Sequence, residues 1–221
     1  MAVVIGNKTQ ANPTPGANNS QVSHTQNTGS DGLLIASFIM ANNRNFTSAT
    51  YGGQAMTQVF ARNLSGSSQR LILYVLENPP TGSNTLRINF NNAVWNPISI
   101  YACSFTGAQA GGNTINLAGS ATPKTSTISV SDGSVVYSFG LSTNVITSIE
   151  IPQGNARPAE FTHNTNRQVR GGLSNGTLAA GTYTIEHNCA TGGITMSTYE
   201  IQEKSGGGGG GATTNDFFLV M

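Results

Sequence analysis

The side chains that could support acid–base chemistry are three aspartates and six glutamates. Hydrolysis of a glycosidic bond needs two carboxyl groups that face each other across that bond, and no pair of these residues stands in a recognisable catalytic spacing. The glutamates fall mostly at the ends of expected strands or on the polar phase of an alternating pattern, as Glu150 and Glu203 do. Such positions are typical of solvated faces and ion pairs, so we expect no catalytic residue.

Metal ligands and nucleophiles are equally sparse. His24, His163 and His187 are isolated in the sequence, whereas zinc sites on one element use short, fixed ligand spacings. Cys103 and Cys189 match no ligand spacing and are too few for a disulfide framework. We expect both to be small buried side chains, and whether they pair is left open. No serine lies in a G-x-S-x-G elbow, so the sequence predicts neither an enzyme nor a bound metal or cofactor.

The single tryptophan, Trp95, is the best candidate for contact with a sugar. It lies in the loop-like stretch 91–97, whereas the six tyrosines all fall in expected strands. Its amphipathic ring suits either of two roles. It anchors the loop on the core, or it forms a glycan contact.

Both ends of the chain place apolar residues beside flexible sequence. Six glycines at 206–211 are followed, after 212–216, by an apolar segment at 217–221, and a glycine-rich stretch behaves as a flexible tether. Residues 3–5 form an apolar strand that adds either to this domain or to the open edge of a neighbour. We therefore expect an assembly interface made of Val3, Val4, Ile5, Phe217, Phe218, Leu219 and Val220.

The composition restricts the class of partner. Only 9% of the 221 residues are charged and the net charge is +1, so there is no basic excess of the kind that nucleic-acid binding leaves. No apolar window of about 18 residues predicts a membrane span, and residues 1–8 do not read as a signal peptide. A neutral surface rich in amides and hydroxyls favours a virion shell, made in the host cytoplasm, or an extracellular module.

The elements that must position these residues are strands. Alternating or β-branched apolar runs are bounded by Gly, Asn, Pro and Ser clusters, and no segment has a sustained helical period. The sequence therefore predicts an all-β protein, a single antiparallel β-sandwich of jelly-roll type. We expect strands at 2–8, 32–41, 49–51, 55–62, 70–77, 84–89, 98–105, 125–130, 134–141, 157–163, 167–171, 181–188 and 193–202.

The same pattern predicts the organisation of the chain. We expect an N-terminal strand and arm at 1–31, a sandwich domain at 32–204, and a glycine-rich linker with an apolar tail at 205–221. Within these parts, 12–30 lacks apolar periodicity and is predicted as an arm, and 107–124 is predicted as a long surface loop. No internal repeat is convincing.

Three stretches resemble β-sandwich modules of jelly-roll or immunoglobulin-like type from phage virion structural proteins and bacterial extracellular proteins. They are the hairpin Tyr-Gly-Gly-Gln-Ala-Met-Thr at 51–57, the strand end Asn-Pro-Pro-Thr-Gly at 78–82, and Ser-Phe-Thr-Gly at 104–107. The resemblance spans about residues 32–202 and involves turns and core positions, so it implies a fold and carries no catalytic residue.

Together these observations predict a non-enzymatic structural protein of a phage virion, as a head decoration, shell or fibre component. Its expected partners are copies of itself and other virion proteins. The alternative is a carbohydrate-binding or adhesive extracellular module that uses Trp95 against host-surface glycans. Neither interpretation involves nucleic acid or membrane insertion.

Overall fold

The computed structural model describes residues 2–13, 18–27, 31–41, 46–64, 69–91, 98–119, 123–151, 161–162, 169–189 and 192–205. Every helix or strand assigned among these residues is a β-strand. All the strand pairings are antiparallel. The predicted all-β class is therefore confirmed.

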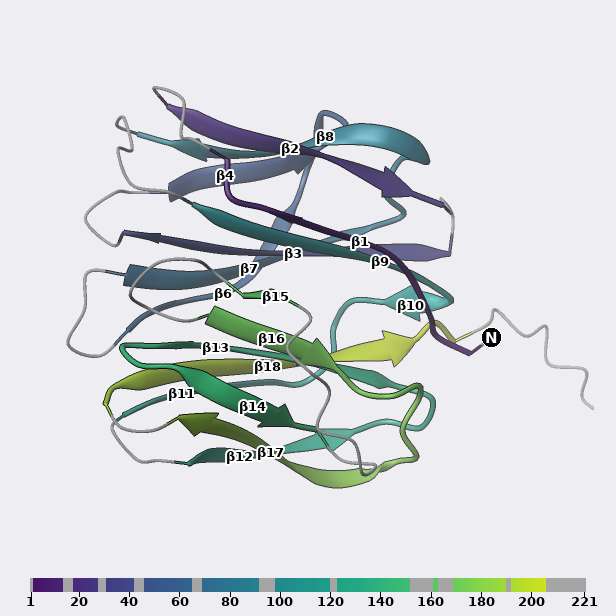
Figure 1. Ribbon diagram of the computed structural model, residues 1–221. Helices are drawn as coiled ribbons and strands as arrows, with labels where there is room; N and C mark the ends of the chain where they lie inside the picture. Colours follow the sequence, from purple (N-terminus) through teal and green to yellow (C-terminus); the bar gives the residue numbers. More distant parts are fainter. Residues whose placement is uncertain are drawn as a thin grey trace, which may run out of the picture.

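The first half of the chain forms two facing sheets (Figure 1). The first outer sheet has the strand order β2-β8-β4-β5, and the first inner sheet has the order β1-β9-β3-β7-β6. Their strands are β1 (Val4–Ala11), β2 (Asn19–Gln26), β3 (Gly32–Ala41), β4 (Phe46–Tyr51), β5 (Gln54–Ala55), β6 (Thr57–Asn63), β7 (Gln69–Glu77), β8 (Gly82–Phe90) and β9 (Ser99–Thr106).

The second half repeats this connectivity. The second inner sheet has the order β10-β18-β13-β16-β15, with β11 also paired to β18, and the second outer sheet has the order β12-β17-β14. Their strands are β10 (Ala108–Gln109), β11 (Thr114–Gly119), β12 (Lys124–Val130), β13 (Val135–Ser142), β14 (Ile146–Glu150), β15 (Phe161–Thr162), β16 (Val169–Leu173), β17 (Gly181–Cys189) and β18 (Ile194–Glu203).

The pairing order in each half is that of a jelly roll. The opening strand (β1 or β11) lies beside the last strand (β9 or β18), which lies beside β3 or β13, while β2 or β12 lies beside β8 or β17. This arrangement folds two antiparallel sheets over one core. The predicted sandwich is confirmed, and the structure shows that its connectivity occurs twice in the chain.

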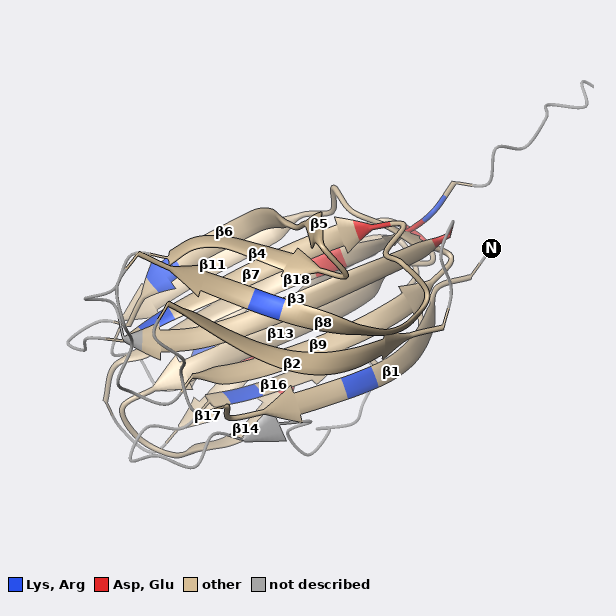
Figure 2. Cartoon of the chain, turned by 90° about the horizontal axis from the view of Figure 1, so that it is seen from above, with Lys and Arg blue, Asp and Glu red and all other residues tan. Residues whose placement is uncertain are grey.

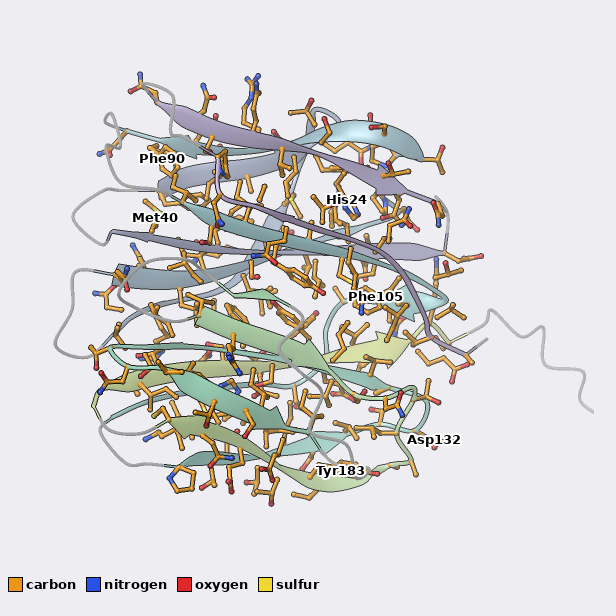
Figure 3. The ribbon with its side chains drawn as sticks, in the orientation of Figure 1. His24, Met40, Phe90, Phe105, Asp132 and Tyr183 are labelled. Atoms are coloured by element: carbon orange, nitrogen blue, oxygen red, sulfur yellow. The ribbon has the colours of Figure 1, made fainter. Side chains whose placement is uncertain are left out.

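The four sheets stack as four layers with three apolar cores between them (Figure 1). The first core, between the first outer and inner sheets, contains Met40 and Phe90. The central core, between the two inner sheets, contains Phe105. The third core lies between the second inner and outer sheets, with Tyr183 packed against its edge. Figure 3 labels these four side chains.

The stacking explains two kinds of strand sequence. Strands of the inner sheets are covered on both faces, and every residue of β13 is accordingly buried. In β12, by contrast, Thr125, Thr127 and Ser129 are exposed while the residues between them are buried. A strand with two buried faces reads as a continuous apolar run, and one with a solvated face alternates.

The central core is aromatic and joins the two halves. Tyr101 and Tyr137 stack across it with ring centroids 5.8 Å apart, and Phe60 stacks on Phe139 at 5.4 Å. The Tyr137 hydroxyl also shares a hydrogen bond of 2.8 Å with Ser37 Oγ. Because each pair has one member in each inner sheet, neither half can separate without exposing large aromatic surface.

Two predictions of irregular structure are wrong. The stretch 12–30, predicted as an arm, contains β2, which pairs with β8. Its inward-facing side chains include Ser20, His24 and Gln26, and these polar residues conceal the strand period of two. The stretch 107–124, predicted as a loop, contains β10 and β11, which pair with β18 on either side of a break at 110–113.

The expectation for the cysteines is confirmed. Cys103 and Cys189 are both free thiols and both buried. Cys103 lies in the central core and Cys189 in the third core, so each acts as a small apolar side chain.

Candidate functional site

The predicted N-terminal interface strand belongs to this chain. β1 pairs with β9 from Val4 opposite Thr106 onward, so pairing within the domain is the alternative that the structure shows. Val3 is 6% exposed in the central core, and Ile5 packs against that core. Val4 points the other way and is 58% exposed. Of the three predicted residues, Val4 alone is left for contact with a partner.

The other predicted interface residues, Phe217, Phe218, Leu219 and Val220, lie outside the described residues, as does Trp95. Their roles stay predictions. The last described residue before the glycine-rich segment is Ser205, which directly follows β18 and Lys204.

A groove opens at the edge of the second jelly roll, between β11 and β12. Its volume is about 560 Å³. The lining residues are Ile115, Leu117, Thr125, Ser126, Thr127 and Thr184. Ile115 and Leu117 are partly buried and pack against the third core, so the groove leads from solvent to the apolar interior. Ser126 is buried, and its hydroxyl has no hydrogen-bond partner among the described residues.

Polar contacts close both ends of this groove. At one end Asn113 Nδ2 donates to the Ser129 carbonyl at 2.8 Å. At the other end Lys124 Nζ donates to the Ala118 carbonyl at 3.4 Å. An apolar floor with hydroxyl groups at its rim suits an extended, mainly apolar ligand.

The corresponding edge of the first jelly roll, between β1 and β2, is bridged by side chains. Thr9 Oγ1 and His24 Nδ1 share a hydrogen bond of 2.8 Å, and Asn7 Nδ2 donates to the Thr25 carbonyl at 3.0 Å. Burial lowers the pKa of His24 from 6.5 to about 4, so the imidazole is neutral near pH 7. Side chains thus bridge this edge in both halves, from Thr9 and Asn7 in the first and from Asn113 and Lys124 in the second.

The two outer faces carry ladders of neutral polar side chains. On the second outer sheet, Thr127 lies opposite Thr184, and Ser129 shares a hydrogen bond of 3.1 Å with Thr182. On the first outer sheet, Ser23 lies opposite Thr85. Further exposed neutral members of these ladders are Gln21, Thr25, Ser83 and Thr125. Two charged residues interrupt them, Arg87 opposite Gln21 and Glu186 opposite Thr125. Figure 2, seen from the side of the first outer sheet, shows few charged positions on that sheet.

A buried Ser–His pair lies inside the second jelly roll. His187 Nε2 and Ser138 Oγ are 2.8 Å apart, and Ser138 also bonds Thr198 Oγ1 at 2.9 Å. Gly140 provides the space, because a Cβ there would collide with the imidazole. A serine beside a histidine is the start of a nucleophilic site, but His187 and Ser138 are both 0% exposed. The pair therefore has no contact with solvent or substrate and acts in packing.

This histidine predicts a pH-dependent stability. Burial lowers the pKa of His187 from 6.5 to about 3. Between these two pH values the imidazole is protonated in the unfolded chain and neutral in the folded chain, so the free energy of unfolding falls as the pH drops below 6.5. When the pH is lowered from about 6.5 to 5, we expect the free energy of unfolding, measured by urea denaturation, to fall in both proteins. The fall should be about 2 kcal/mol smaller in His187→Gln than in the parent. Equal losses in both proteins would show that another group is responsible.

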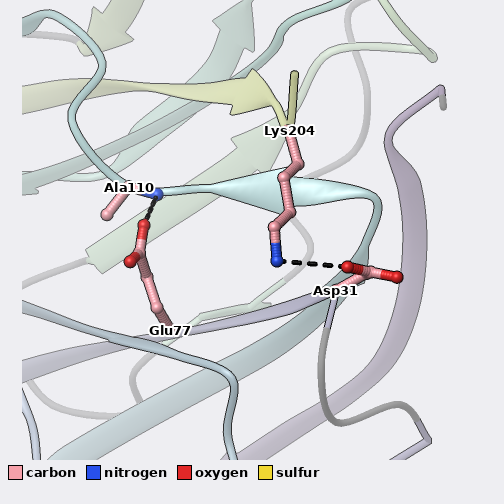
Figure 4. A network of polar contacts seen from close by, with 4 residues as sticks. All are labelled: Asp31, Glu77, Ala110 and Lys204. Carbon is pink, nitrogen blue, oxygen red and sulfur yellow. Dashed lines mark hydrogen bonds and ion pairs between the residues drawn. The ribbon is translucent and has the colours of Figure 1, made fainter. Parts of the chain in front are cut away.

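The junction between the halves is tied by a small polar network (Figure 4). Lys204 Nζ lies 3.1 Å from Asp31 Oδ1, and the Ala110 N–H donates to Glu77 Oε1 at 2.7 Å. Backbone bonds from Gly107 and Ala108 to the Asp31 carbonyl add to it. The network holds β10 and the end of β18 at the first jelly roll, which fixes where the chain leaves toward residue 206.

Glu200 is a second node at this end of the molecule. Its carboxylate is buried and accepts hydrogen bonds from the Ser131 N–H at 2.5 Å, Ser134 Oγ at 2.8 Å and the Asn113 N–H at 2.9 Å. Burial by itself would raise its pKa, but these hydrogen bonds outweigh burial and lower the pKa. Gly112 is required beside it, since a Cβ at that position would overlap the Glu200 backbone.

The sequence reasoning missed the groove and Glu200. The alternation Ile115, Leu117 and then Ser126, Ile128, Val130 could have revealed two strands, but the many turn-forming residues of 107–124 favoured a loop. Nothing local marks Glu200, because its partners are 66 to 87 positions away in sequence.

Within the described ranges, no group of three or more His, Cys, Asp or Glu side chains is placed to hold a metal ion. Nor does that part of the chain contain a helix with the length and apolar character to cross a membrane. No protein-family model matches the sequence, and a search of curated proteins returned no significant match.

Proposed function

We propose that this chain is a non-enzymatic structural protein of a phage virion, a head decoration, shell or fibre component that assembles with copies of itself. The observation that carries the proposal is the pair of polar ladders, made mainly of neutral side chains, on the two outer sheets. Charged residues are depleted from the centres of protein interfaces. A chain with only 9% charged residues and a net charge of +1 lets many copies pack with little mutual repulsion.

The terminal segments supply the attachment. Val4 is an exposed apolar side chain on the edge strand β1, and an edge strand can accept a further strand. At the other end, each large apolar side chain that becomes buried contributes about 1.5–3 kcal/mol. Ordering the glycines at 206–211 costs about 1–2 kcal/mol per residue, so the tail residues must bury together to give net attachment.

Truncation tests this proposal. We expect the full chain to form oligomers and a chain ending at Ser205 to show a single-chain mass by light scattering. A length-matched variant with serine at Phe217, Phe218, Leu219 and Val220 should behave like the truncation, because it keeps the tether and loses the apolar surface. Thr213→Ser and Thr214→Ser serve as the control and should assemble normally. Unchanged oligomers after truncation would contradict assembly through the tail.

The second candidate is a carbohydrate-binding or adhesive module. The hydroxyl and amide ladders favour it too, since such groups can both donate and accept hydrogen bonds with sugar hydroxyls. In the truncation experiment this function predicts an unchanged mass with glycan binding retained. A contact through Trp95 stays a prediction of this candidate.

A further inference from the structure

We infer that the two outer sheets are complementary surfaces, and that the first outer sheet of one copy lies on the second outer sheet of the next copy. The contact joins Arg87 of one copy to Glu150 and Glu186 of its neighbour. The inference rests on the proposed function and deepens it, because it names the surfaces that meet when copies assemble. The observation that carries it is a reversal of charge at one equivalent position of two matching faces.

The two outer sheets match residue by residue. Their central strands are β8 and β17, which align from Gly82 with Gly181 to Phe90 with Cys189. Along these nine positions the two patterns of exposure differ only at the sixth, which is charged in both strands. Exposed Ser and Thr side chains occupy the same places on either face.

The match extends to a hydrogen bond and a bulge. Asn89 Nδ2 donates to Ser48 Oγ at 3.0 Å in the first outer sheet, and Asn188 Nδ2 donates to Ser148 Oγ at 3.0 Å in the second. The register of the flanking strand, β4 or β14, shifts just before each of these serines. The two faces therefore share a backbone shape, and a residue on one face has a defined counterpart on the other.

At the charged position the two faces differ in sign. On the first face, Arg87 lies between the neutral residues Gln21 and Thr50. On the second face, Glu186 lies directly opposite Glu150. Like charges directly opposite each other in a sheet repel, and neither carboxylate forms an ion pair with a residue that the structure describes. An arginine placed against this pair relieves the repulsion, because a guanidinium can bind carboxylates through several N–H groups at once.

The geometry of the molecule allows copies to stack. The outer sheets are the first and last of the four layers, so they face opposite neighbours (Figure 1). Asn78, ahead of β8, donates its N–H to the Gly32 carbonyl, and Ser131, beside the start of β17, accepts a hydrogen bond from Gln202 near the end of β18. Both strands therefore begin at the end of the molecule that holds the network of Figure 4. Since the charged residue is the sixth of each strand, the opposite charges lie at similar heights on the two faces.

The charges favour a head-to-tail order over a symmetric pair. Two first outer sheets in contact would bring two arginines together, and two second outer sheets would bring four carboxylates together. Contact between unlike faces repeats in one direction, and it forms a ring or a filament according to its angle. Charged contacts determine which surfaces meet more than they tighten binding. This contact therefore orders copies that the terminal segments attach.

Exchanging the equivalent residues in the full-length chain tests the inference. Thr50→Glu with Arg87→Glu gives both faces a carboxylate pair, and Glu150→Thr with Glu186→Arg gives both faces an arginine. The combined variant carries all four changes, exchanges the two faces and keeps the net charge of +1. Arg62→Glu is the matched control, since Arg62 is exposed on β6, outside both faces.

We expect each single-face exchange to weaken association about tenfold, measured by light scattering over a range of concentrations, because like charges then meet. The combined variant should associate as the parent does, since its faces are complementary again. Arg62→Glu should also behave like the parent. In the parent itself, association should weaken as the salt concentration rises, because salt screens the contact.

Equal association of all variants, in samples that light scattering shows to be oligomeric, would overturn the assignment of the faces and leave attachment through the tail intact. A combined variant as weak as the single-face exchanges would also overturn it. The salt test needs no variant, so an association of the parent that salt leaves unchanged would overturn the inference even where an exchanged chain does not fold. A parent that is monomeric at every concentration would overturn both proposals.

Discussion

Phe139→Ala is expected to lower the free energy of unfolding by about 3–5 kcal/mol, the usual cost of truncating a buried phenylalanine. Phe139 is 0% exposed, and its ring stacks on Phe60 at 5.4 Å and on Tyr137 at 5.1 Å. The cavity would open in the central core that both jelly rolls share. We therefore expect both halves to lose stability together and to unfold in one transition.

Calorimetry with far-UV and near-UV circular dichroism measures this result. The control is Val145→Ala, because Val145 is 44% exposed and should change stability by less than about 0.5 kcal/mol. A double-mutant cycle with Phe60→Ala should show coupling, since the two rings touch. Two separate transitions, with only the second half destabilised, would mean that the halves are independent and that the central core does not join them.

Glu200→Ala is expected to cost about 3–5 kcal/mol at neutral pH, because it leaves two backbone N–H groups and a buried hydroxyl without their acceptor. These donors belong to Ser131, Asn113 and Ser134. The folded pKa of Glu200 lies below its ordinary value of 4.5. The contribution of the Glu200 carboxylate to the free energy of unfolding is therefore complete above pH 4.5, and it is lost as the pH falls through the folded pKa.

Urea denaturation at neutral pH and below pH 4.5 checks both parts of this prediction. Glu203→Ala is the matched control, since Glu203 lies on the same strand and is only partly buried, and its cost should stay under about 1 kcal/mol. The parent should lose stability below pH 4.5 more steeply than Glu200→Ala. Parallel pH profiles for the two proteins would contradict the role given to the carboxylate.

Periodicity predicts the strands of this fold where one face is apolar. The continuous run Leu33–Met40 follows from burial on both faces of its strand, and the alternation in β12 follows from burial on one face. It fails at β2, whose inward residues Ser20, His24 and Gln26 are polar. It also fails to show the duplication, because two jelly rolls can share connectivity without sharing residues.

The functional surfaces depend on tertiary placement that a sequence does not carry. Whether Val3 or Val4 faces a neighbour depends on the register of β1 on β9, and a shift of one residue would reverse the answer. The groove depends on how the edges of two sheets, at Leu117 and Ser126, lie relative to each other in space. The apolar character of 217–220, in contrast, is read directly from the sequence.

The molar mass of the intact chain in solution tests the central claim most directly. Light scattering over a range of concentrations is predicted to give a multiple of 22.9 kDa, with residues 217–220 protected from hydrogen exchange only in the oligomer. A mass of 22.9 kDa at every concentration, with that segment protected against its own body, would contradict the account.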